Sequence, residues 1–518
     1  MLLLIFGLNT PALFSQVTSQ DIDDIVARAM DNFTVAGVAV AVVKDGKITH
    51  QKGYGIQSIA TDKKVTENTN FGIASNSKAF TTASLAILVE EGKISWTDKV
   101  VQYIPEFKMY NDYVTQNFNI QDLLTHRSGL GLSIGDLMFF PDGSDFTIDD
   151  ILGSFQYFEP VSAFRTKFDY DNLLYSVAGE VIKRVSGLTW EQFIEARIFE
   201  PLSMDHSYAS FTYIKDQSKV ASPHLNKAQK LSLTDPEQWD PTKINGAAGG
   251  IYSNVHDLAN WMLVQLNKGK YGADLEQQLF TEASQQEMWK IHTTTEINRN
   301  PRYQSHFSGY GLGWNLTDVN GTMVVSHTGG LIGTLSKTML VPDLNLGIIV
   351  LTNTHLDGAG VFSVVTQSLL DKYLGLDDFD WIGRHTKKLN QGASEADAVE
   401  AKIWATVAAA NTTIIDIKNY AGLYKDLWFG NIEIYEKNQQ LWFRSVRSPK
   451  LSGPMQFYRA NTFVVKWPAS GLTDADAFVM FQLDEEGKAQ GFKMKGISPA
   501  IDFSFDFQDL HPKRINGQ

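Results

Sequence analysis

The chain has 518 residues and a formal net charge of −13, from 45 Lys and Arg against 58 Asp and Glu. An acidic balance of this size argues against nucleic acid or an anionic membrane surface as a partner. Cysteine is absent from the sequence, which excludes disulfides, thiol catalysis and cysteine-ligated metal sites. The length exceeds that of one ordinary hydrophobic core, so we expect two or more domains.

The first residues are typical of a secretory signal peptide. Met1–Leu8 and Pro11–Ser15 form an apolar run that is too short to span a bilayer and ends in small residues, with cleavage expected near Ser15-Gln16. The basic segment that usually precedes such a run is missing, since the first basic residue is Arg28. We expect residues 1–16 to be a signal peptide and the protein to be periplasmic or secreted. No later segment is apolar enough to predict a membrane span.

The next part of the chain predicts an antiparallel sheet with helices inserted between its strands. Asp45-Gly46 separates two strand-like runs and favours a hairpin turn. The predicted elements are helix Ile22–Asn32, strands Gly37–Lys44 and Lys47–Lys52, mostly helices and long loops over residues 75–270, strands between Tyr310 and Asn353, and helix Ala359–Leu374. A sheet with strands from both ends of the domain indicates the α+β class.

Ser75-Asn76-Ser77-Lys78 opens an apolar-periodic segment that runs from Ala79 to Glu91 and stops at Gly92, a good helix C-terminal cap. Residues i and i+3 share one helical face, so the Lys78 amine can reach the Ser75 hydroxyl. A helix start directs free N–H groups toward that hydroxyl, which suits a nucleophile in acyl transfer. An isolated match would instead favour an N-cap serine beside a solvated lysine.

Two further motifs reverse that preference. Tyr170-Asp171-Asn172 precedes a predicted helix beginning at Leu173, and His327-Thr328-Gly329-Gly330 follows the strand-like run Thr322–Val325. The order Ser-x-x-Lys, Tyr-x-Asn, then His-Thr-Gly resembles the serine β-lactamase and penicillin-binding superfamily. Within it the chain is most similar to the class C β-lactamase-related serine hydrolases, which include D-amino-acid peptidases and carboxylesterases.

The resemblance covers about residues 20 to 380. Further segments that resemble the family, in the same order, are Phe71–Ser75, Leu123–Leu130, Ala248–Ser253, Met339–Pro342 and Gly347–Asn353. It implies a β-lactamase/transpeptidase-like antiparallel sheet flanked by helices, with a helical lobe, over residues 20–382. The active site would then lie in a cleft between the sheet and that lobe.

The resemblance also implies a role for each motif residue. Ser75 would be the nucleophile and Lys78 the general base, which requires a pKa well below the ordinary value of about 10.4. Tyr170 would pass the proton to the leaving group, and Asn172 would orient Lys78 and bind the substrate. The backbone N–H groups of Ser75 and Gly330 would form the oxyanion hole. The plainer alternatives are a surface amine for Lys78, a core tyrosine for Tyr170 and a helix N-cap for Asn172.

His327 departs from the Lys-Thr-Gly of most β-lactamases and penicillin-binding proteins. It would bind substrate together with Thr328 and Gly329, but neutral imidazole offers a hydrogen bond where lysine offers a permanent charge. Histidine here resembles the peptidase, amidase and esterase members, which puts β-lactam hydrolysis in doubt. No cofactor is implied, and the eleven histidines show no metal-binding spacing.

The rest of the chain predicts a helical connector over 383–412 and an all-β domain over 413–515. Ser394–Asp397 has capping-box spacing, and an Ala-rich helix follows to about Ala410. Short alternating aromatic strands then indicate a small barrel or sandwich. The predicted strands are Gly430–Glu436, Gln440–Arg444, Phe463–Trp467, Ala477–Phe481 and Ile501–Phe505. This domain resembles the lipocalin-like β-domain attached to many family members.

The aromatic residues of this domain have two interpretations. Trp428, Trp442, Phe443 and Trp467 either pack inside it or form an apolar contact surface. Gly131–Gly135 matches the Gly-x-Ser-x-Gly elbow of α/β-hydrolases, but the buried strand that the elbow requires before Ser133 is not predicted. We therefore interpret that match as chance.

These observations predict a secreted or periplasmic serine hydrolase that acts through an acyl-enzyme on short peptides or small amides, including those with D-residues. A carboxylesterase is the nearest alternative and a β-lactamase the third. From another class, a sensor of penicillin or peptidoglycan fragments would acylate without turnover. The expected partner is a small molecule or short peptide, and we expect the chain to form a homo-oligomer through the C-terminal β-domain.

Overall fold

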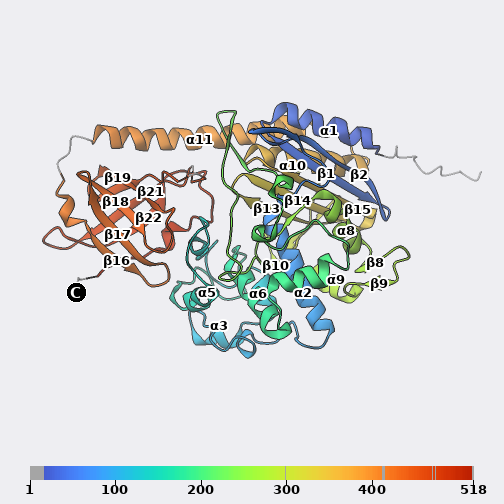
Figure 1. Cartoon of the computed structure of the whole chain (residues 1–518), viewed down its shortest axis with the longest axis horizontal. Helices are drawn as coiled ribbons and strands as arrows, with labels where there is room; N and C mark the ends of the chain where they lie inside the picture. Colours follow the sequence, from blue (N-terminus) through green and yellow to red (C-terminus); the bar gives the residue numbers. More distant parts are fainter. Residues whose placement is uncertain (1–16, 298, 411–414, 470, 473, 516–518) are drawn as a thin grey trace, which may run out of the picture.

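A computed structural model describes residues 17–297, 299–410, 415–469, 471–472 and 474–515. The signal peptide expected over 1–16 lies outside these residues. A sheet-and-helix domain and a smaller barrel lie side by side, and one long helix runs along both of them (Figure 1). Among the described helices, none combines the length and apolarity needed to cross a bilayer.

The large domain is built on a nine-stranded sheet with the order β10-β11-β12-β13-β14-β15-β1-β2-β3. β1 pairs antiparallel with β15, with Val40 opposite Val350, so strands from both ends of the domain meet as predicted. β2 continues beyond the predicted end at Lys52 to Ser58. The strands are β1 (Gly37–Lys44), β2 (Lys47–Ser58), β3 (Thr61–Lys64), β10 (Thr293–Thr294), β11 (Ser308–Tyr310), β12 (Asn315–Val319), β13 (Thr322–Leu331), β14 (Thr334–Val341) and β15 (Leu346–Thr352).

Helices cover both faces of this sheet. Val38, Val40 and Val42 of β1 belong to the core under α1 (Ser19–Asn32) and α10 (Asp357–Tyr373). The alternate residues Ala39, Ala41 and Val43 belong to the core on the other face, where α8 (Val255–Leu266) packs on β1. Because both faces are buried, β1 is apolar along nearly its whole length rather than alternating.

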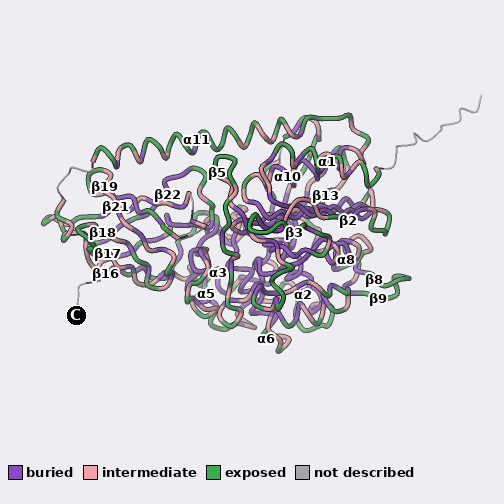
Figure 2. Tube along the Cα trace, turned by 45° about the horizontal axis from the view of Figure 1, so that its top comes forward, coloured by how far each residue is buried: buried purple, intermediate pink, exposed green. Residues whose placement is uncertain are grey.

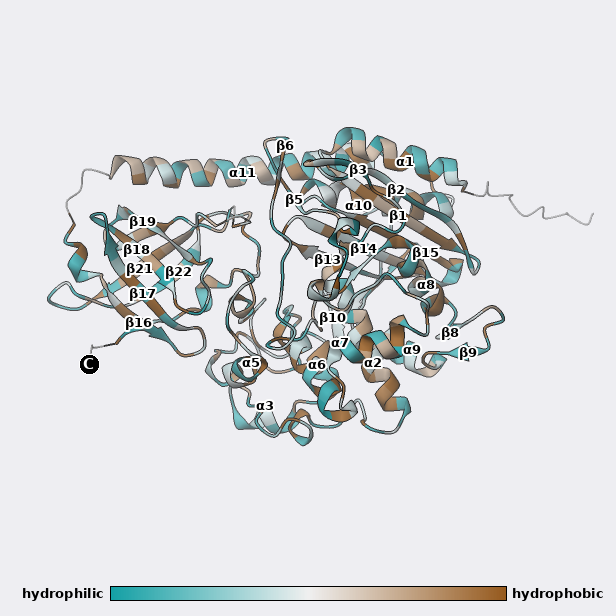
Figure 3. Ribbon diagram, in the orientation of Figure 1, coloured by the Kyte–Doolittle hydropathy of each residue, from teal (hydrophilic) through white to brown (hydrophobic). Residues whose placement is uncertain are grey.

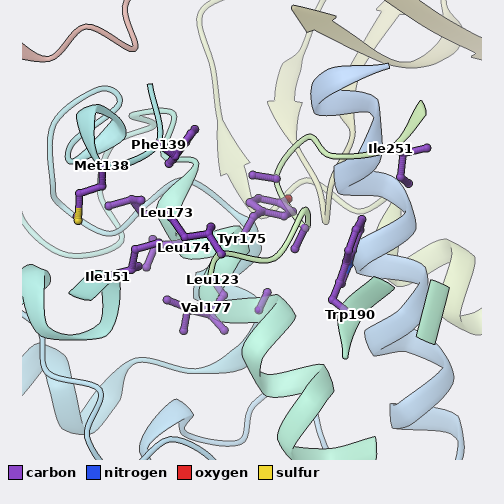
Figure 4. Close-up of a cluster of buried hydrophobic side chains, with 14 of the residues drawn as sticks. Leu123, Met138, Phe139, Ile151, Leu173, Leu174, Tyr175, Val177, Trp190 and Ile251 are labelled. Carbon is purple, nitrogen blue, oxygen red and sulfur yellow. The ribbon is translucent and has the colours of Figure 1, made fainter. Parts of the chain in front are cut away.

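The helical lobe packs around α2 (Ser77–Glu90), which is buried on all sides from Ser77 to Leu88 and carries many hydrophobic residues (Figure 3). Gly92 follows its end with φ 67°, as predicted. Figure 4 shows the buried side chains of this lobe, with Leu173 and Tyr175 near the centre and Trp190 at one edge. The other helices are α3 (Asp112–Asn117), α4 (Ile120–Leu124), α5 (Ile148–Ser154), α6 (Leu173–Ser186), α7 (Trp190–Ile194) and α9 (Glu282–Met288), and the short strands are β4 (Phe71–Gly72), β5 (His224–Lys227), β6 (Lys230–Leu233), β7 (Tyr252–Ser253), β8 (Lys270–Tyr271) and β9 (Gln277–Gln278).

The connector is one unbroken helix, α11 (Trp381–Ala409), with much of its surface exposed (Figure 2). The start predicted from Ser394–Asp397 is wrong, because Asp380 caps the helix by accepting a hydrogen bond from Gly383 N at 2.8 Å. A capping-box spacing inside a long Ala-rich segment does not interrupt the helical hydrogen bonds. Near its C-terminal end, Ile403 and Val407 pack against the barrel.

The C-terminal domain is a closed eight-stranded barrel, which confirms the barrel alternative. Its strands are β16 (Gly422–Asp426), β17 (Gly430–Lys437), β18 (Gln440–Ser445), β19 (Ser452–Arg459), β20 (Thr462–Val465), β21 (Ala477–Leu483), β22 (Ala489–Gly496) and β23 (Lys513–Arg514). The strand predicted over Ile501–Phe505 is wrong, since this segment is a loop between β22 and β23. Asp502 holds it in a turn, accepting from Ser504 N at 2.9 Å while its carbonyl accepts from Phe505 N at 3.0 Å.

The aromatic residues of the barrel divide between its interior and the contact with the sheet-and-helix domain. Phe443 and Trp467 are buried inside, with ring centroids 5.3 Å apart. Trp428 is also buried, but it packs edge-on against Phe158 of the helical lobe at 5.3 Å. Close to this contact, Arg447 of the barrel pairs with Asp145 and Asp150 of the lobe. Phe443 and Trp467 thus pack inside the barrel and Trp428 lies in the contact between the domains, so the interpretation that all of these aromatic residues pack inside is wrong.

Replacing Trp428 with Ala should destabilise the protein by about 3–5 kcal/mol, the usual cost of truncating a large buried aromatic side chain. Trp442 is a matched control, because it is only half-buried. Its ring centroid lies 6.5 Å from that of Tyr435 and 4.1 Å from Lys437 Nζ. We expect Trp442→Ala to cost about 1 kcal/mol. Denaturant unfolding followed by circular dichroism measures both, and equal losses would contradict the assignment of Trp428 to the domain contact.

Candidate active site

Ser75 lies on a sharp turn between β4 and α2. Ala74 has φ 50°, a left-handed conformation that costs a non-glycine residue on the order of 1–3 kcal/mol. Ser75 then sits in a 3₁₀ turn over Ala74–Asn76, just before α2 begins. Ile73 N donates to Ile251 O at 2.9 Å and fixes the incoming strand. The strained turn is thus held by its neighbours and presents the Ser75 side chain at the base of a cleft.

The Lys78 amine is fully buried and has three acceptors around it. Its Nζ lies 3.0 Å from Ser75 Oγ, 2.7 Å from Asn172 Oδ1 and 2.8 Å from the carbonyl oxygen of Ala248. The amide and carbonyl oxygens only accept hydrogen bonds. When Lys78 is neutral, its two N–H groups are therefore taken by Asn172 and Ala248, and its lone pair faces the Ser75 hydroxyl. This is the geometry of a general base on a nucleophile.

Burial brings this amine into the pKa range of a base. Removal from water lowers the pKa of Lys78 to about 7, although the nearby Asp136 and Asp171 carboxyls oppose the shift. Burial likewise raises the pKa of Asp136 to about 7 and that of Asp171 to about 8. A substantial fraction of Lys78 is thus neutral near pH 7, as the predicted role requires. The alternative of a surface amine is wrong for Lys78.

Asn172 stands directly before α6, but its side chain makes no capping bond to the helix. Its amide instead connects two buried groups, accepting from Lys78 and donating from Nδ2 to Asp136 Oδ2 at 2.8 Å. Asp171 Oδ1 accepts from Leu174 N at 3.3 Å and so supplies the helix start with its acceptor. Sequence reasoning missed Asp136, since only the fold brings its turn against Asn172.

Tyr170 lies on the other side of the amine, with its ring centroid 4.8 Å from Lys78 Nζ. Burial raises the pKa of its phenol above the ordinary value, against a smaller lowering by a hydrogen bond with Ser75. Tyr170 is therefore a neutral phenol near pH 7. The His126 ring lies 4.3 Å from the Tyr170 ring, and His126 Nδ1 accepts from Asp171 N at 3.1 Å. His126 thus supports the Tyr-x-Asn segment.

His327 is buried, and burial lowers its pKa to about 3. Its Nδ1 lies 2.6 Å from the carbonyl oxygen of Thr328, so Nδ1 carries the proton and Nε2 accepts from the Tyr310 hydroxyl at 2.9 Å. Both ring nitrogens therefore have protein partners. Neutral His327 lines the cleft without offering a charge, and its contact with substrate remains a prediction.

The strand edge that follows His327 alternates between buried and exposed residues. His327 and Gly329 are buried, whereas Thr328 and Gly330 are exposed. A Cβ on Gly329 would lie 2.1 Å from Ile73 O, so the close approach of β13 to the nucleophile turn requires glycine at that position. At Gly330 the nearest atom, of Leu335, would be 3.2 Å away. Gly330 and Ser75 both line the cleft, and their oxyanion role remains a prediction.

The cleft has a volume of about 500 Å³ and a mainly apolar wall. Large contributors are Phe139, Phe140, Phe168, Trp239, Leu331 and Phe503. Its charged lining residues, among those that the structure describes, are Asp474 and Asp502, with no Lys or Arg. Both aspartates come from the barrel, as does Phe503, whose ring is 6.0 Å from that of Tyr170. The barrel is therefore part of the cleft wall.

Ser133 of the Gly-x-Ser-x-Gly match does not line this cleft. It lies in a loop with φ 57°, with no strand directly before it, and its hydroxyl is buried. Its backbone N donates to Tyr170 O at 2.7 Å, which makes it a support for that residue. The interpretation of the match as chance is confirmed. Within the described ranges, no group of three His, Asp or Glu side chains is placed to hold a metal ion.

Comparison with known proteins adds two family matches. The family described as Beta-lactamase matches residues 22–362, and the one described as Domain of unknown function (DUF3471) matches residues 409–514. The Unguisins hydrolase ungD' of Aspergillus campestris (strain IBT 28561) is 28% identical over 373 residues, which cover 70% of this chain and 67% of that protein. Protein flp of Staphylococcus aureus (strain MW2) is 28% identical over 343 residues, covering 65% of this chain and 64% of that protein.

Solved structures share the fold at lower identity. The octameric penicillin-binding protein homologue from Pyrococcus abyssi has a TM-score of 0.59 and 20% identity, and the match covers 95% of this chain and 99% of that one. EstCE1, a hydrolase with promiscuous acyltransferase activity, has a TM-score of 0.55 and 18% identity, with 67% of this chain and 96% of that one covered. The first match extends over nearly the whole chain, barrel included.

The position of Lys78 predicts a pH dependence for acylation of Ser75. Because the base must be neutral, the rate of labelling by a fluorophosphonate should rise with pH, with a midpoint near the Lys78 pKa of about 7, and level off above it. Lys78→Ala should lower the labelling rate by about 10²–10⁴-fold and remove this rise. A profile that is flat across the midpoint in the native protein, or near-normal labelling of Lys78→Ala, would require a different base.

Proposed function

Because the chain belongs to the beta-lactamase family, we propose that it is a serine hydrolase of short peptides or small amides, including those with D-residues, and that it works through an acyl-enzyme on Ser75. The observation that carries this proposal is the buried Lys78 amine, 3.0 Å from the Ser75 hydroxyl, whose other two contacts are acceptors only. That arrangement supports activation of a serine at neutral pH without a histidine or a metal.

The steps follow from these contacts. Ser75 Oγ attacks the substrate carbonyl carbon while its proton passes to Lys78 Nζ. The oxyanion of the tetrahedral intermediate accepts from the backbone N–H groups of Ser75 and Gly330. Collapse of the intermediate breaks the C–N bond, and the leaving amine takes a proton that Tyr170 donates and Lys78 restores. Water then attacks the acyl ester and passes its proton to Lys78. Collapse of this second intermediate breaks the bond between the acyl carbon and Ser75 Oγ, and Lys78 returns the proton to Ser75 Oγ as the acid is released.

The lining of the cleft supports a substrate that is apolar and carries no carboxylate near the reacting bond. Two aspartates and no Lys or Arg are among the described residues that line the cleft, and His327 is neutral, so the wall offers no permanent positive partner for an anionic group. This disfavours β-lactams, whose ring carboxylate needs a positive partner. A neutral or cationic amide with bulky apolar groups fits better, in keeping with similarity to a protein named as an unguisins hydrolase.

Two alternative functions would use the same Ser75 chemistry. Similarity to EstCE1 favours a carboxylesterase, and esters need less protonation of the leaving group. A sensor that acylates without turnover would share the same Ser75 chemistry and would show a burst with no steady state. We also propose a periplasmic or secreted location and a homo-oligomer through the barrel, the latter on its similarity to an octameric homologue.

A turnover screen tests the proposed function. The full-length protein is assayed with D- and L-aminoacyl amides, p-nitrophenyl esters and a chromogenic cephalosporin. We expect steady-state hydrolysis of an apolar amide, little or none of the cephalosporin, and complete loss of activity and labelling in Ser75→Ala. Ser133→Ala is the control and should retain both hydrolytic turnover and labelling of Ser75. Labelling at Ser133, or a burst without turnover on every substrate, would contradict the proposal.

Tyr170→Phe should separate amides from esters. Without the phenol, expulsion of an amine loses its proton donor, so amide turnover should fall by about 10²–10⁴-fold. A p-nitrophenolate leaves without a proton, so turnover of the p-nitrophenyl ester should fall much less. The ratio of the two losses is the measurement, and equal losses would show that Tyr170 acts on Ser75 rather than on the leaving group.

A further inference from the structure

The loop between β22 and β23 leaves the barrel and enters the catalytic domain. Five of its residues, Ala500 and Asp502–Phe505, line the cleft that holds Ser75. The next residue, Asp506, points away from solvent and is completely buried. A buried carboxylate requires specific partners, and those of Asp506 belong to the other domain.

Asp506 accepts two backbone hydrogen bonds from the catalytic domain. Gly135 N donates to Oδ2 at 2.6 Å, and Leu137 N donates to Oδ1 at 3.0 Å. These two N–H groups flank Asp136 at the start of a 3₁₀ turn over Asp136–Met138. Gly135 has φ 79°, and a Cβ there would lie 2.4 Å from a Leu173 methyl group, so the turn is also packed closely against α6.

The residue between these two donors belongs to the contacts that hold the catalytic amine. Asp136 accepts from Asn172 at 2.8 Å, and Asn172 accepts from Lys78 at 2.7 Å. We propose that Asp506 of the barrel is a positioning residue for Lys78 and acts through Asp136 and Asn172. This inference rests on the proposed function only in that Lys78 is taken as the base.

A carboxylate suits this place better than any neutral side chain. Each oxygen receives one N–H, whereas the amide of an asparagine would face one of the two donors with its own NH₂ group. Asp506→Asn keeps the shape but leaves one buried N–H without an acceptor. The turn that carries Asp136 should then loosen, so that water reaches Lys78 and the amine loses its fixed direction.

The direction in which the pKa of Lys78 changes in an Asp506 variant distinguishes positioning from a direct electrostatic effect. The titratable groups that face Lys78 are Asp136, Asp171, Tyr170, Tyr175, His126 and His327. Burial raises the pKa of Asp506, while the N–H groups of Gly135 and Leu137 oppose that rise. Where Asp506 is ionised, removal of its negative charge would by itself lower the pKa of a nearby lysine. Hydration of the pocket would raise it toward the ordinary value, because burial is the main cause of the lowering. A rise therefore indicates that the turn has opened.

The experiment uses the full-length chain and compares the native protein with Asp506→Asn, Asp506→Ala and Arg447→Met. Arg447→Met is the matched control, because it removes the ion pairs to Asp145 and Asp150 in the same domain contact without touching the Asp136 turn. Fluorophosphonate labelling of Ser75 is measured across pH, the Lys78 titration is followed by NMR of isotope-labelled lysine side chains, and melting temperatures are recorded for all four proteins.

We expect Asp506→Asn to lower the labelling rate at pH 7 about tenfold or more, and to raise the midpoint of the profile and of the Lys78 titration by about one pH unit. Arg447→Met should leave both midpoints in place even if its melting temperature falls as far. A folded Asp506→Asn protein with a native rate and midpoint, or with a lowered midpoint, would overturn the inference. If Ser75 is not labelled in the native protein, the proposed function fails, and the NMR titration alone still decides the role of Asp506.

Discussion

The burial of one amine determines how the candidate active site is built. Lys78 lies in the first turn of a helix that has no exposed face over most of its length, so it must find every hydrogen-bond partner inside the protein. Asn172, Ala248 and Ser75 supply them, each from a different segment. A buried ammonium without partners would be prohibitively costly, whereas a buried neutral amine with two acceptors is stable and basic. The same desolvation that makes the amine expensive to bury makes it reactive.

The segment before β7, the nine-stranded sheet and the barrel surround Lys78 and bring the residues of the site together. The segment before β7 is attached to α2 by side-chain bonds, since Thr81 Oγ1 donates to Ala247 O at 2.7 Å and Ser77 Oγ accepts from Ile251 N at 3.1 Å. The nine-stranded sheet brings β13 against the nucleophile turn from the opposite side. The barrel begins at Gly422, more than 300 residues after Lys78, and its loop between β22 and β23 forms part of the cleft wall. The site is thus assembled from the whole length of the molecule.

Local sequence patterns were sufficient to predict many of the strands, turns and helix ends of the large domain. The Val-rich run of β1, the Asp45-Gly46 turn and the glycine after α2 each depend on neighbours within a few residues, and each prediction was confirmed. The three sequence motifs were recognisable because each places two candidate site residues within a few positions of the chain. Their convergence around Lys78 then followed from the fold that the family shares.

The supporting groups could not be predicted in this way. Asp136 is an ordinary aspartate in a loop, the Ala248 acceptor is a backbone atom with no side-chain signature, and Tyr310 comes from a three-residue strand. The loop over Ile501–Phe505 alternates between apolar and polar residues as a strand does, but its aromatic residues Phe503 and Phe505 line the cleft. In each case a contact between segments far apart in the chain decides the outcome, and periodicity carries no information about such contacts.

The glycine at position 329 has a consequence for how substrate preference and chemistry are related. At this point β13 approaches the Ala74–Asn76 turn without a side chain of its own, and Ser336 of β14 holds that turn by donating to Ile73 O at 2.7 Å and accepting from Asn76 Nδ2 at 2.8 Å. Many of the large side chains that shape the cleft lie elsewhere, such as Phe139 and Trp239 of the helical lobe and Phe503 of the barrel. Substitutions there can change which molecules enter while a carbonyl group is still held in the same slot. A protein built in this way can acquire new substrates without rebuilding its catalytic centre.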